Sequence, residues 1–275
     1  MIVDLHCHSN FSDGELSPEA LLERARLAEI TLFSITDHDT LAAYRQLDLP
    51  LAGDMRLLSG VEISCNLETS ELHVIGLNVD IDNQALNNLL DYNQTLRKDK
   101  AAWVIARLIH LGYSDIQPFL DELATGPIVC RTHLAQALVK AGIVPDYERA
   151  FKQFLGRSGK VWKRPQWRDC ATVIQTIQNA GGIAILAHPT KYRFSSGKMS
   201  WVIEQFAALG GDAMEVNYSG LSPNHKAYLK RMALKYELAA SVGSDFHRPA
   251  QRYAPLGGFH QIDSSLPTVW QQLAL

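Results

Sequence analysis

Short apolar runs separated by amphipathic stretches recur toward both ends of the chain. The runs have the length of buried strands, and the stretches between them have the 3.6-residue period of helices. Ser17-Pro18-Glu19 predicts a helix start, with Ser17 as N-cap and Pro18 at the first helical position. The strands expected in the first part are Ile2–His6, Leu32–Ile35, Leu57–Val61 and Leu72–Leu77.

The pattern becomes helical from about Asn83. A long amphipathic stretch spans Ala85–Leu111, and shorter helices are expected at Thr132–Ala141 and Tyr147–Phe154. From about Cys170 the alternation of strands and helices resumes. The later elements expected are helices over 170–180, 199–209 and 224–236 and strands over 183–187, 213–216 and 239–242.

Repeated strand–helix units indicate a parallel sheet, most simply a TIM-like barrel. The helical middle then reads as an insertion into an α/β fold. We therefore expect a barrel domain made of residues 1–82 and 170–275, and a mainly helical, basic insertion or cap over residues 83–169.

Composition narrows the class of protein. The 275 residues are 47% hydrophobic and 20% charged, with a net charge of −3, as in ordinary soluble proteins. The four cysteines are scattered, which favours a reducing compartment and argues against a thiolate zinc site. No apolar run approaches the ~20 residues of a membrane span, and Asp4, His6 and Asp13 stand where a signal peptide would be basic and apolar. We expect a cytoplasmic protein without membrane association and infer no obligate protein partner.

Net charge also differs between the helical middle of the chain and the rest. Residues 93–170 hold 13 basic and 7 acidic side chains, a net +6, whereas the remainder is net −9. Basic helices often have a solvated face, and that explanation stays open. The other interpretation is a basic cap over an acidic barrel, suited to a polyanionic substrate.

Histidines and carboxylates gather where the apolar runs end. His6 and His8 stand two residues apart, so strand alternation sends both imidazoles to one side. In a parallel barrel the carboxyl ends of all strands meet at one face, where active sites lie. The candidates placed at or beside such ends are His6, His8, Asp13, His38, Glu62, His73, His188, Asp245 and His247.

These nine side chains exceed the needs of one zinc ion, which in catalytic sites takes three protein ligands and water. They suit two or three divalent ions. Ligation by His, Asp and Glu without thiolate points first to Mn²⁺, with Fe²⁺ or Zn²⁺ as alternatives, and less readily to Mg²⁺, which prefers oxygen. Such clusters activate water and neutralise phosphoryl charge in phosphatases and nucleases.

The motifs His6-x-His8, Thr36-Asp37-His38, Gly60-Val61-Glu62-Ile63-Ser64, His188-Pro189 and Ser244-Asp245-x-His247 resemble those of the PHP (polymerase and histidinol phosphatase) family. The match covers nearly the whole chain in order. Within the family, the insertion and Pro165-Gln166-Trp167 resemble bacterial 3′,5′-nucleoside bisphosphate phosphatases, a group that includes a 5′–3′ exoribonuclease. The resemblance implies a distorted (β/α)7 barrel, the PHP fold, with a trinuclear site at its mouth.

The resemblance also implies how the ligands divide among three ions. The expected sets are His6, His8, Glu62 and Asp245 for the first ion, Glu62, His73 and His188 for the second, and Asp13, His38 and His247 for the third. Glu62, Asp245 and His188 are also the expected catalytic residues. Asp37 and Asp39 are expected to orient His38 or neighbouring ligands.

Substrate phosphate needs cationic donors on the side away from the metals. Arg131 precedes Thr132, the expected N-cap of a helix, and helix N-termini attract anions. The resemblance implies that basic residues contact the substrate phosphates in three regions, around Arg131, around Arg157 and Lys160, and around Lys191. The substrate-binding candidates are Arg131, Arg157, Lys160, Lys191 and Tyr192. His133 and His225 are weaker candidates for the pocket rim, whereas His110 and His260 read as structural or surface residues.

The expected activity is that of a metal-dependent phosphoesterase, a phosphoric monoester hydrolase that removes the 3′-phosphate of 3′,5′-nucleoside bisphosphates. We also expect 5′–3′ exoribonuclease action on short RNA 5′ ends. Two alternatives stay open, namely another phosphatase of the family, for example one acting on histidinol phosphate, and a non-catalytic module that binds metal or nucleic acid. The sequence leaves the physiological metal, the main substrate, the oligomeric state and the general acid undetermined.

Overall fold

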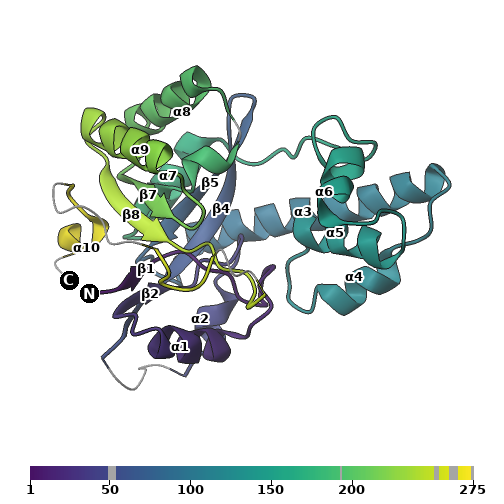
Figure 1. Cartoon of the computed structure of the whole chain (residues 1–275), viewed down its shortest axis with the longest axis horizontal. Helices are drawn as coiled ribbons and strands as arrows, with labels where there is room; N and C mark the ends of the chain where they lie inside the picture. Colours follow the sequence, from purple (N-terminus) through teal and green to yellow (C-terminus); the bar gives the residue numbers. More distant parts are fainter. Residues whose placement is uncertain (49–53, 193, 251–253, 260–265, 274–275) are drawn as a thin grey trace.

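The computed structural model describes residues 1–48, 54–192, 194–250, 254–259 and 266–273 (Figure 1). The first three strands form a small parallel sheet in the order β1-β2-β3. They are β1 (Val3–Asp4), β2 (Leu32–Ser34) and β3 (Arg56–Leu58). The short strands of this sheet carry the beginning of the chain toward the site described below.

The second sheet has five strands in the order β4-β5-β6-β7-β8. They are β4 (Gly60–Leu67), β5 (Ser70–Leu77), β6 (Ile183–Leu186), β7 (Ala213–Tyr218) and β8 (Ala239–Gly243). The pairs β6–β7 and β7–β8 are parallel, but β5 is antiparallel to both β4 and β6. The expectation of an entirely parallel sheet is therefore wrong at β5. Only Glu68 and Thr69 separate β4 from β5, and so short a connection can join only antiparallel strands.

The third expected strand, Leu57–Val61, also differs from the structure. It divides at Ser59 into β3 and the eight-residue β4, so Glu62 lies inside a strand rather than at its end. Gly60 stands at the junction, where a Cβ atom would lie only 2.2 Å from Ser34 Oγ. The chain can pass this close to β2 only without a side chain.

The two sheets are hydrogen-bonded to each other at both edges. Beside β1, Leu5 N–H donates to Val242 O at 3.0 Å and Asp245 N–H donates to His6 O at 2.8 Å. At the other edge Asp39 N–H donates to Glu62 O at 3.0 Å. These bonds bring the ends of β1, β2, β4 and β8 together, and with them the histidine motifs that follow the strands.

Helices flank the sheets on the outside (Figure 1). They are α1 (Pro18–Leu27), α2 (Ala42–Gln46), α7 (Cys170–Asn179), α8 (Ser196–Ala208), α9 (Pro223–Lys235) and α10 (Val269–Gln272). The predicted start of the first helix is confirmed, because Ser17 Oγ accepts from Ala20 N–H and Pro18 is its first residue. None of the described helices is long and apolar enough to cross a bilayer.

The middle of the chain forms a helical lobe that projects from the sheets (Figure 1). It contains α3 (Gln84–His110), α4 (Gln117–Leu123), α5 (Arg131–Lys140), α6 (Tyr147–Ala150) and a π-helical turn, η1 (Phe151–Leu155). The first turns of α3 bury Leu86 and Leu90 in the main core, whereas Val104 and Leu108 belong to a separate apolar cluster within the lobe. The long helix therefore joins two cores.

Candidate metal centre

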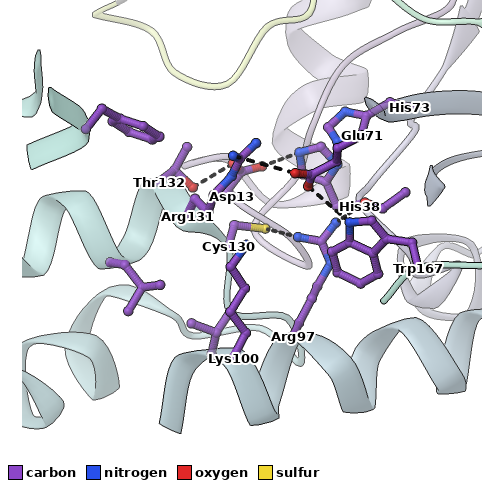
Figure 2. Close-up of a pocket in the computed structure, with 14 residues that line it drawn as sticks. Asp13, His38, Glu71, His73, Arg97, Lys100, Cys130, Arg131, Thr132 and Trp167 are labelled. Carbon is purple, nitrogen blue, oxygen red and sulfur yellow. Dashed lines mark hydrogen bonds and ion pairs between the residues drawn. The ribbon is translucent and has the colours of Figure 1, made fainter. Parts of the chain in front are cut away.

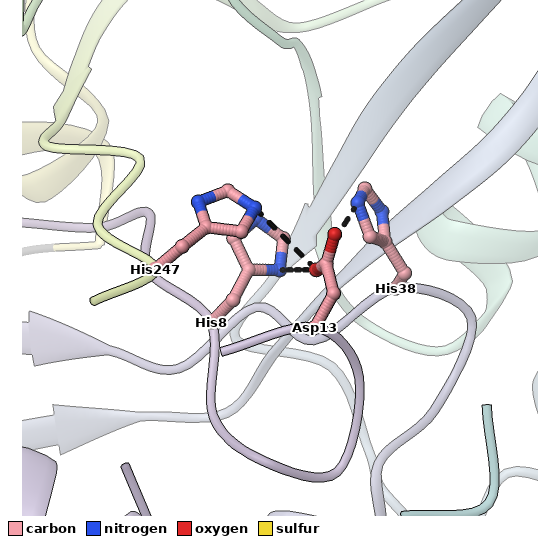
Figure 3. Close-up of side chains that lie close together, drawn as sticks. All are labelled: His8, Asp13, His38 and His247. Atoms are coloured by element: carbon pink, nitrogen blue, oxygen red, sulfur yellow. Dashed lines mark ion pairs between the residues drawn. The ribbon is translucent and has the colours of Figure 1, made fainter. Parts of the chain in front are cut away.

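All nine side chains singled out as metal ligands converge on one site. In four overlapping sets, ligand atoms lie within 4.8 Å of one another. The sets are His8, Asp13, His38 and His247; His6, Glu62 and His188; His6, His8 and Asp245; and His38, Glu62 and His73. Figure 3 shows the first of these, in which three imidazoles surround Asp13. The convergence extends over residues from position 6 to position 247 of the chain.

Glu62 lies at the centre of the cluster and is fully buried. Its Oε1 is 2.9 Å from His73 Nδ1 and 2.8 Å from His188 Nε2. Its Oε2 is 2.9 Å from His38 Nδ1. One carboxylate thus touches imidazoles from three separate segments.

His73 reaches Glu62 because of the antiparallel hairpin. In the register of β4 and β5, Ser64 pairs with His73 and Glu62 pairs with Ile75. Because β5 runs in the opposite direction, its first half lies at the end of the sheet where the parallel strands have their carboxyl ends. His73 was expected on this strand, but the level at which it sits follows from the reversed direction of β5.

Asp13 and Asp245 anchor the other two sides of the cluster. Asp13 Oδ1 lies 3.4 Å from His247 Nε2 and 3.7 Å from His38 Nε2 (Figure 3). Asp245 Oδ1 lies 3.2 Å from His8 Nε2 and 3.4 Å from His6 Nε2. The grouping differs in part from the expected sets, because His38 approaches Glu62 as well as Asp13.

The carboxylates of the cluster are held in the ionised form. Burial acts to raise the pKa of Glu62, but the surrounding imidazoles, His73 foremost, outweigh it and hold that pKa well below its ordinary value. At Asp13 the charge of His247 outweighs burial, and at Asp245 the charge of Lys191 does so. The pKa values of both carboxyl groups are therefore also well below their ordinary values. The site therefore offers three anionic oxygen ligands at neutral pH.

The histidines fall into two groups. Burial lowers the pKa of His8, His38 and His188, which favours the neutral imidazole that binds metal. Burial acts in the same direction at His247, but Asp13 outweighs it and raises the pKa to about 9. At His6 the charge of Glu215 outweighs burial and raises the pKa well above its ordinary value. Metal binding must displace protons from this second group.

The donor atoms fit divalent ions. Two buried side-chain atoms of the cluster, Asp13 Oδ1 and His188 Nδ1, make no hydrogen bond within the described residues, and His38 Nδ1 and Glu62 Oε2 lie 2.9 Å apart without hydrogen-bond geometry. Buried polar atoms without a partner are costly. Carboxylate oxygens and imidazole nitrogens that face one another at ligand spacing would gain that partner from a cation.

Buried carboxylates outside the cluster hold the ligand loops. Asp37 accepts from Ser9 N–H at 2.8 Å and from Ser12 Oγ at 2.5 Å, which shapes the loop between His8 and Asp13. Asp39 accepts from Ser64 N–H at 3.0 Å. Neither belongs to any of the four sets, and the expectation that they orient His38 or neighbouring ligands stays a prediction.

Glu215 is a functional residue that the sequence reasoning missed. It is fully buried in β7, where Oε1 lies 3.0 Å from His6 Nδ1 and Oε2 accepts from His188 N–H at 2.6 Å. This leaves Nε2 of His6 facing the cluster. The sequence feature that could have indicated Glu215 was a single acidic residue inside the apolar run that forms β7. Gly243 leaves room for the contact, since a Cβ there would lie 2.1 Å from His6 Cβ.

Two ligands stand on strained backbone. His188 has φ of 29° and Asp245 has φ of 53°, in the left-handed region that non-glycine residues rarely occupy. Each lies two residues beyond the end of a strand, His188 after β6 and Asp245 after β8. Such strain persists where the surrounding structure imposes it, and it is common at functional sites.

A pocket joins the cluster to the helical lobe (Figure 2). It is lined by the cluster residues Asp13, His38 and His73 and by the cations Lys100 and Arg131. Glu71 lines it too, with Oε2 3.9 Å from Arg131 Nη1. Burial acts to raise the pKa of Glu71, but Arg131 and Lys100 outweigh it and lower the pKa to about 2. The pocket thus brings two cationic side chains and three of the candidate metal ligands together.

Arg131 is the substrate candidate that lies in this pocket (Figure 2). The expected N-cap, Thr132, was two residues off, because Cys130 is the N-cap and Arg131 is the first residue of α5. The hydroxyl of Thr132 is not a cap but donates to Asp13 Oδ2 at 2.7 Å. That bond ties the helix to a metal ligand.

The other four substrate candidates lie elsewhere. Lys191 Nζ contacts Asp245 beside the cluster. The Tyr192 hydroxyl accepts from His73 N–H and donates to Ala187 O, both at 2.9 Å, so it positions a ligand. Neither Arg157 nor Lys160 lines the pocket. Arg157 donates to Thr69 O at 2.9 Å, and Lys160 donates to the Tyr113 hydroxyl at 2.5 Å.

The remaining histidines are outside the four sets. His133 is buried, and its Nδ1 accepts from Cys130 N–H at 3.3 Å at the start of α5. His225 lies in the first turn of α9, and His110 ends α3. His260 lies outside the described residues.

Comparison with known proteins agrees with this geometry. The chain matches the PHP domain model over residues 4–160. A 5′-3′ exoribonuclease of Haemophilus influenzae is 36% identical over 271 residues, which is 98% of each chain. The 5′-3′ exoribonuclease Rnm of Escherichia coli is 35% identical over 98% of this chain and 93% of its own length. A 3′,5′-nucleoside bisphosphate phosphatase of Chromobacterium violaceum is 30% identical over 98% of this chain and 96% of its own.

Solved structures are similar along the whole chain. An amidohydrolase from Chromobacterium violaceum, with bound SO4 and no metal, has a TM-score of 0.89 at 28% identity and covers 100% of this chain and 96% of that one. A protein of Bifidobacterium adolescentis described as a metal-dependent phosphoesterase has a TM-score of 0.78 at 25% identity, covering 99% and 94%. The resemblance drawn from the motifs is confirmed, and the chain belongs to the PHP family.

Proposed function

We propose that this protein is a metal-dependent phosphoesterase that removes the 3′-phosphate of 3′,5′-nucleoside bisphosphates and degrades short RNA from the 5′ end. The observation that carries the proposal is the pocket that joins the histidine–carboxylate cluster to Arg131 and Lys100. A substrate with two phosphates could place one at the ligands and the other at the cations. The names of the relatives support both activities.

Two or three divalent ions would be held by the nine ligands, and Mn²⁺ is our first choice because the set mixes imidazole with carboxylate. Such ions supply Lewis acidity for the attack of water on phosphorus. Glu62 would be shared between ions, since it contacts His38, His73 and His188 at once. His188 and Asp245 complete the group that we assign to catalysis.

The protein side chains bind and orient the substrate. Arg131 presents a planar fork suited to a phosphate, and Lys100 adds a second cation in the same pocket. Glu71 holds both cations in place, because it lies within their electrostatic reach and accepts from Trp167 Nε1 at 3.1 Å. Lys191 would offer a further donor to a phosphate at the cluster once metals engage Asp245.

We propose further that the strands form the distorted seven-stranded barrel of this fold, with β3 and β4 counted as one. The domain boundaries proposed are 1–82 with 170–275 for the barrel, and 83–169 for the lobe. The apolar cluster inside the lobe supports this division. Location in the cytoplasm is supported by four cysteines that are all buried and free.

The test compares Arg131→Ala with wild type on 3′-phosphoadenosine 5′-phosphate and on a simple phosphate monoester, at saturating Mn²⁺. One lost charge-assisted contact is worth about 1.5–3 kcal/mol, so kcat/KM for the bisphosphate should fall about 10–150-fold. The simple monoester should lose much less. Lys140→Ala is the matched control, because Lys140 ends the same helix and pairs with the exposed Glu122.

Equal losses on both substrates would mean that Arg131 serves the reacting phosphate or the fold. Product analysis separates the two activities, since a phosphatase releases inorganic phosphate and an exoribonuclease releases mononucleotides in steps. Metal-loaded protein that hydrolyses neither substrate class would refute the proposed function. Turnover of histidinol phosphate alone would replace it with another activity of the family.

A further inference from the structure

An aromatic surface at the edge of the pocket has no role in the site as described so far. Tyr147 begins α6 and Phe151 begins η1, and their ring centroids lie 5.0 Å apart at 48°. Residues four apart on helical backbone share a face. Phe151 lines the pocket, whereas Tyr147 is 37% exposed. The pair therefore continues the pocket wall outward to solvent.

Arg248 approaches the same place from the barrel. It directly follows His247, whose Nε2 lies 3.4 Å from Asp13 Oδ1. The Cζ atom of Arg248 is 6.0 Å from the Tyr147 ring centroid. In Figure 1 the loop that follows β8 extends toward the helical lobe. We call Tyr147, Phe151 and Arg248 the rim surface.

Tyr147 of the rim surface lies within electrostatic range of the cluster. Burial raises the pKa of Tyr147 most, Asp13 raises it further, and Arg248 and Arg131 act in the opposite direction. Tyr147 is thus within reach of a metal ligand, of the pocket arginine and of Arg248. No carboxylate in the described part of the chain forms an ion pair with Arg248, so its charge is available to an anion.

Aromatic rings beside a guanidinium without an ion-pair partner are typical of surfaces that bind single-stranded nucleic acid. Bases stack on exposed rings, and arginines contact the phosphates between them. The lobe that carries Tyr147 and Phe151 has a net charge of +6 over residues 93–170, which suits a polyanion. The rim surface is also continuous with the pocket, so a chain that fills the pocket could extend over it.

We propose that the rim surface binds the second nucleotide of an RNA substrate, with its base on Tyr147 backed by Phe151 and its 3′ phosphodiester on Arg248. The inference rests on the proposed function, in which the first nucleotide occupies the pocket and its 3′-phosphate lies at the ligands. A nucleoside bisphosphate ends at that phosphate and does not reach the rim surface as RNA does. The rim surface therefore sets the preference for RNA over the mononucleotide.

The experiment measures the ratio of kcat/KM for a 5′-phosphorylated tetra-adenylate to kcat/KM for 3′-phosphoadenosine 5′-phosphate, at saturating Mn²⁺. Tyr147→Ala should lower the ratio about 5- to 150-fold, which is the range for one lost base stack. Tyr147→Phe should preserve it, because the ring remains. Arg248→Ala should lower it about tenfold or more.

Binding gives a second measurement that needs no turnover. The dissociation constant of a fluorescent, 5′-phosphorylated tetra-adenylate is followed by anisotropy in EDTA across a salt series. Arg248→Ala should reduce the slope of log K against log salt by about 0.7, the value for one phosphate contact on a single strand. Tyr147→Ala should weaken binding without changing the slope.

Arg231→Ala is the matched control, since its guanidinium lies 5.4 Å from the Tyr228 ring on α9, another arginine–tyrosine pair. It should change neither the ratio nor the slope. Equal losses on the two substrates, or an unchanged ratio with unchanged binding, would overturn the inference while leaving the proposed function intact. If wild type hydrolyses neither substrate, the proposed function fails, and the binding series still decides whether the rim surface holds RNA.

Discussion

The pair formed by Arg97 and Asp39 should be among the most costly contacts to break in this protein. Arg97 on α3 donates from Nε to Asp39 Oδ2 at 2.7 Å and from Nη2 to Ser64 Oγ at 2.8 Å. Its Nη2 also lies 2.6 Å from Asp39 Oδ2, and the Asp39 side chain is fully buried. The pair joins the helical lobe to the loop that carries His38.

The magnitude follows from what Arg97→Ala would leave behind. Asp39 Oδ1 would keep Asn93 Nδ2 at 2.7 Å and Ser64 N–H at 3.0 Å, but Oδ2 would lose both of its donors. Removing one partner of a buried ion pair costs about 3–5 kcal/mol, because the other charge stays buried without compensation. At about 2–4 °C per kcal/mol for a chain of this size, Tm should fall by roughly 6–20 °C.

The assay is thermal unfolding of the metal-free protein, with Arg26→Ala as the matched control. Arg26 Nη1 lies 2.5 Å from Glu23 Oε2, but the two side chains are 57% and 56% exposed. Such a pair contributes only about 0–1 kcal/mol. If Arg97→Ala and Arg26→Ala lowered Tm equally, the reasoning from burial would be refuted. Arg97→Lys should recover part of the loss, because one ammonium cannot reproduce the guanidinium fork.

Two further predictions concern the cluster. We expect wild type to bind two or more Mn²⁺ ions and Glu62→Gln to bind fewer, since Glu62 contacts His38, His73 and His188. Elemental analysis after reconstitution measures the number of bound ions, and Glu23→Gln, at an exposed position, is the control. In metal-free protein the pKa of His247 is raised to about 9, whereas an unfolded histidine has a pKa of about 6.5. The protonated imidazole therefore stabilises the fold fully below about pH 6.5, and this stabilisation is lost as pH rises through 9. The Tm of wild type should therefore fall more steeply between pH 6.5 and 9.5 than that of His247→Gln, and parallel profiles would contradict this assignment.

The sequence was most informative where neighbouring residues decide the structure. Ser17 and Pro18 start α1 as expected, because capping depends on residues within one turn. The His6-x-His8 pair points its imidazoles to one side because alternation is a property of extended backbone. The π-helical end of the helix predicted at Tyr147–Phe154 was not expected, and neither were the short helices α2 and α4.

Charged residues were harder to place than ligands. Arg131 faces the pocket, whereas Lys160 rests on Tyr113 within the lobe and Arg157 reaches the β4–β5 turn. Nothing local separates these three bases, since each is a cation in the same basic segment. Lys100 lines the pocket and was overlooked because it lies in a charged run within a long helix, where such a run suggests a solvated face.

What the sequence determined by itself was the family and which residues are candidate ligands, because both depend on residue types at strand ends and on their order. The tertiary structure decided which ligands share a neighbour. Glu62 meets His73 only because β5 reverses direction, and Glu215 meets His6 across 209 residues of chain. Contacts of this kind arise from the pairing and packing of distant strands, which local alternation and capping do not specify.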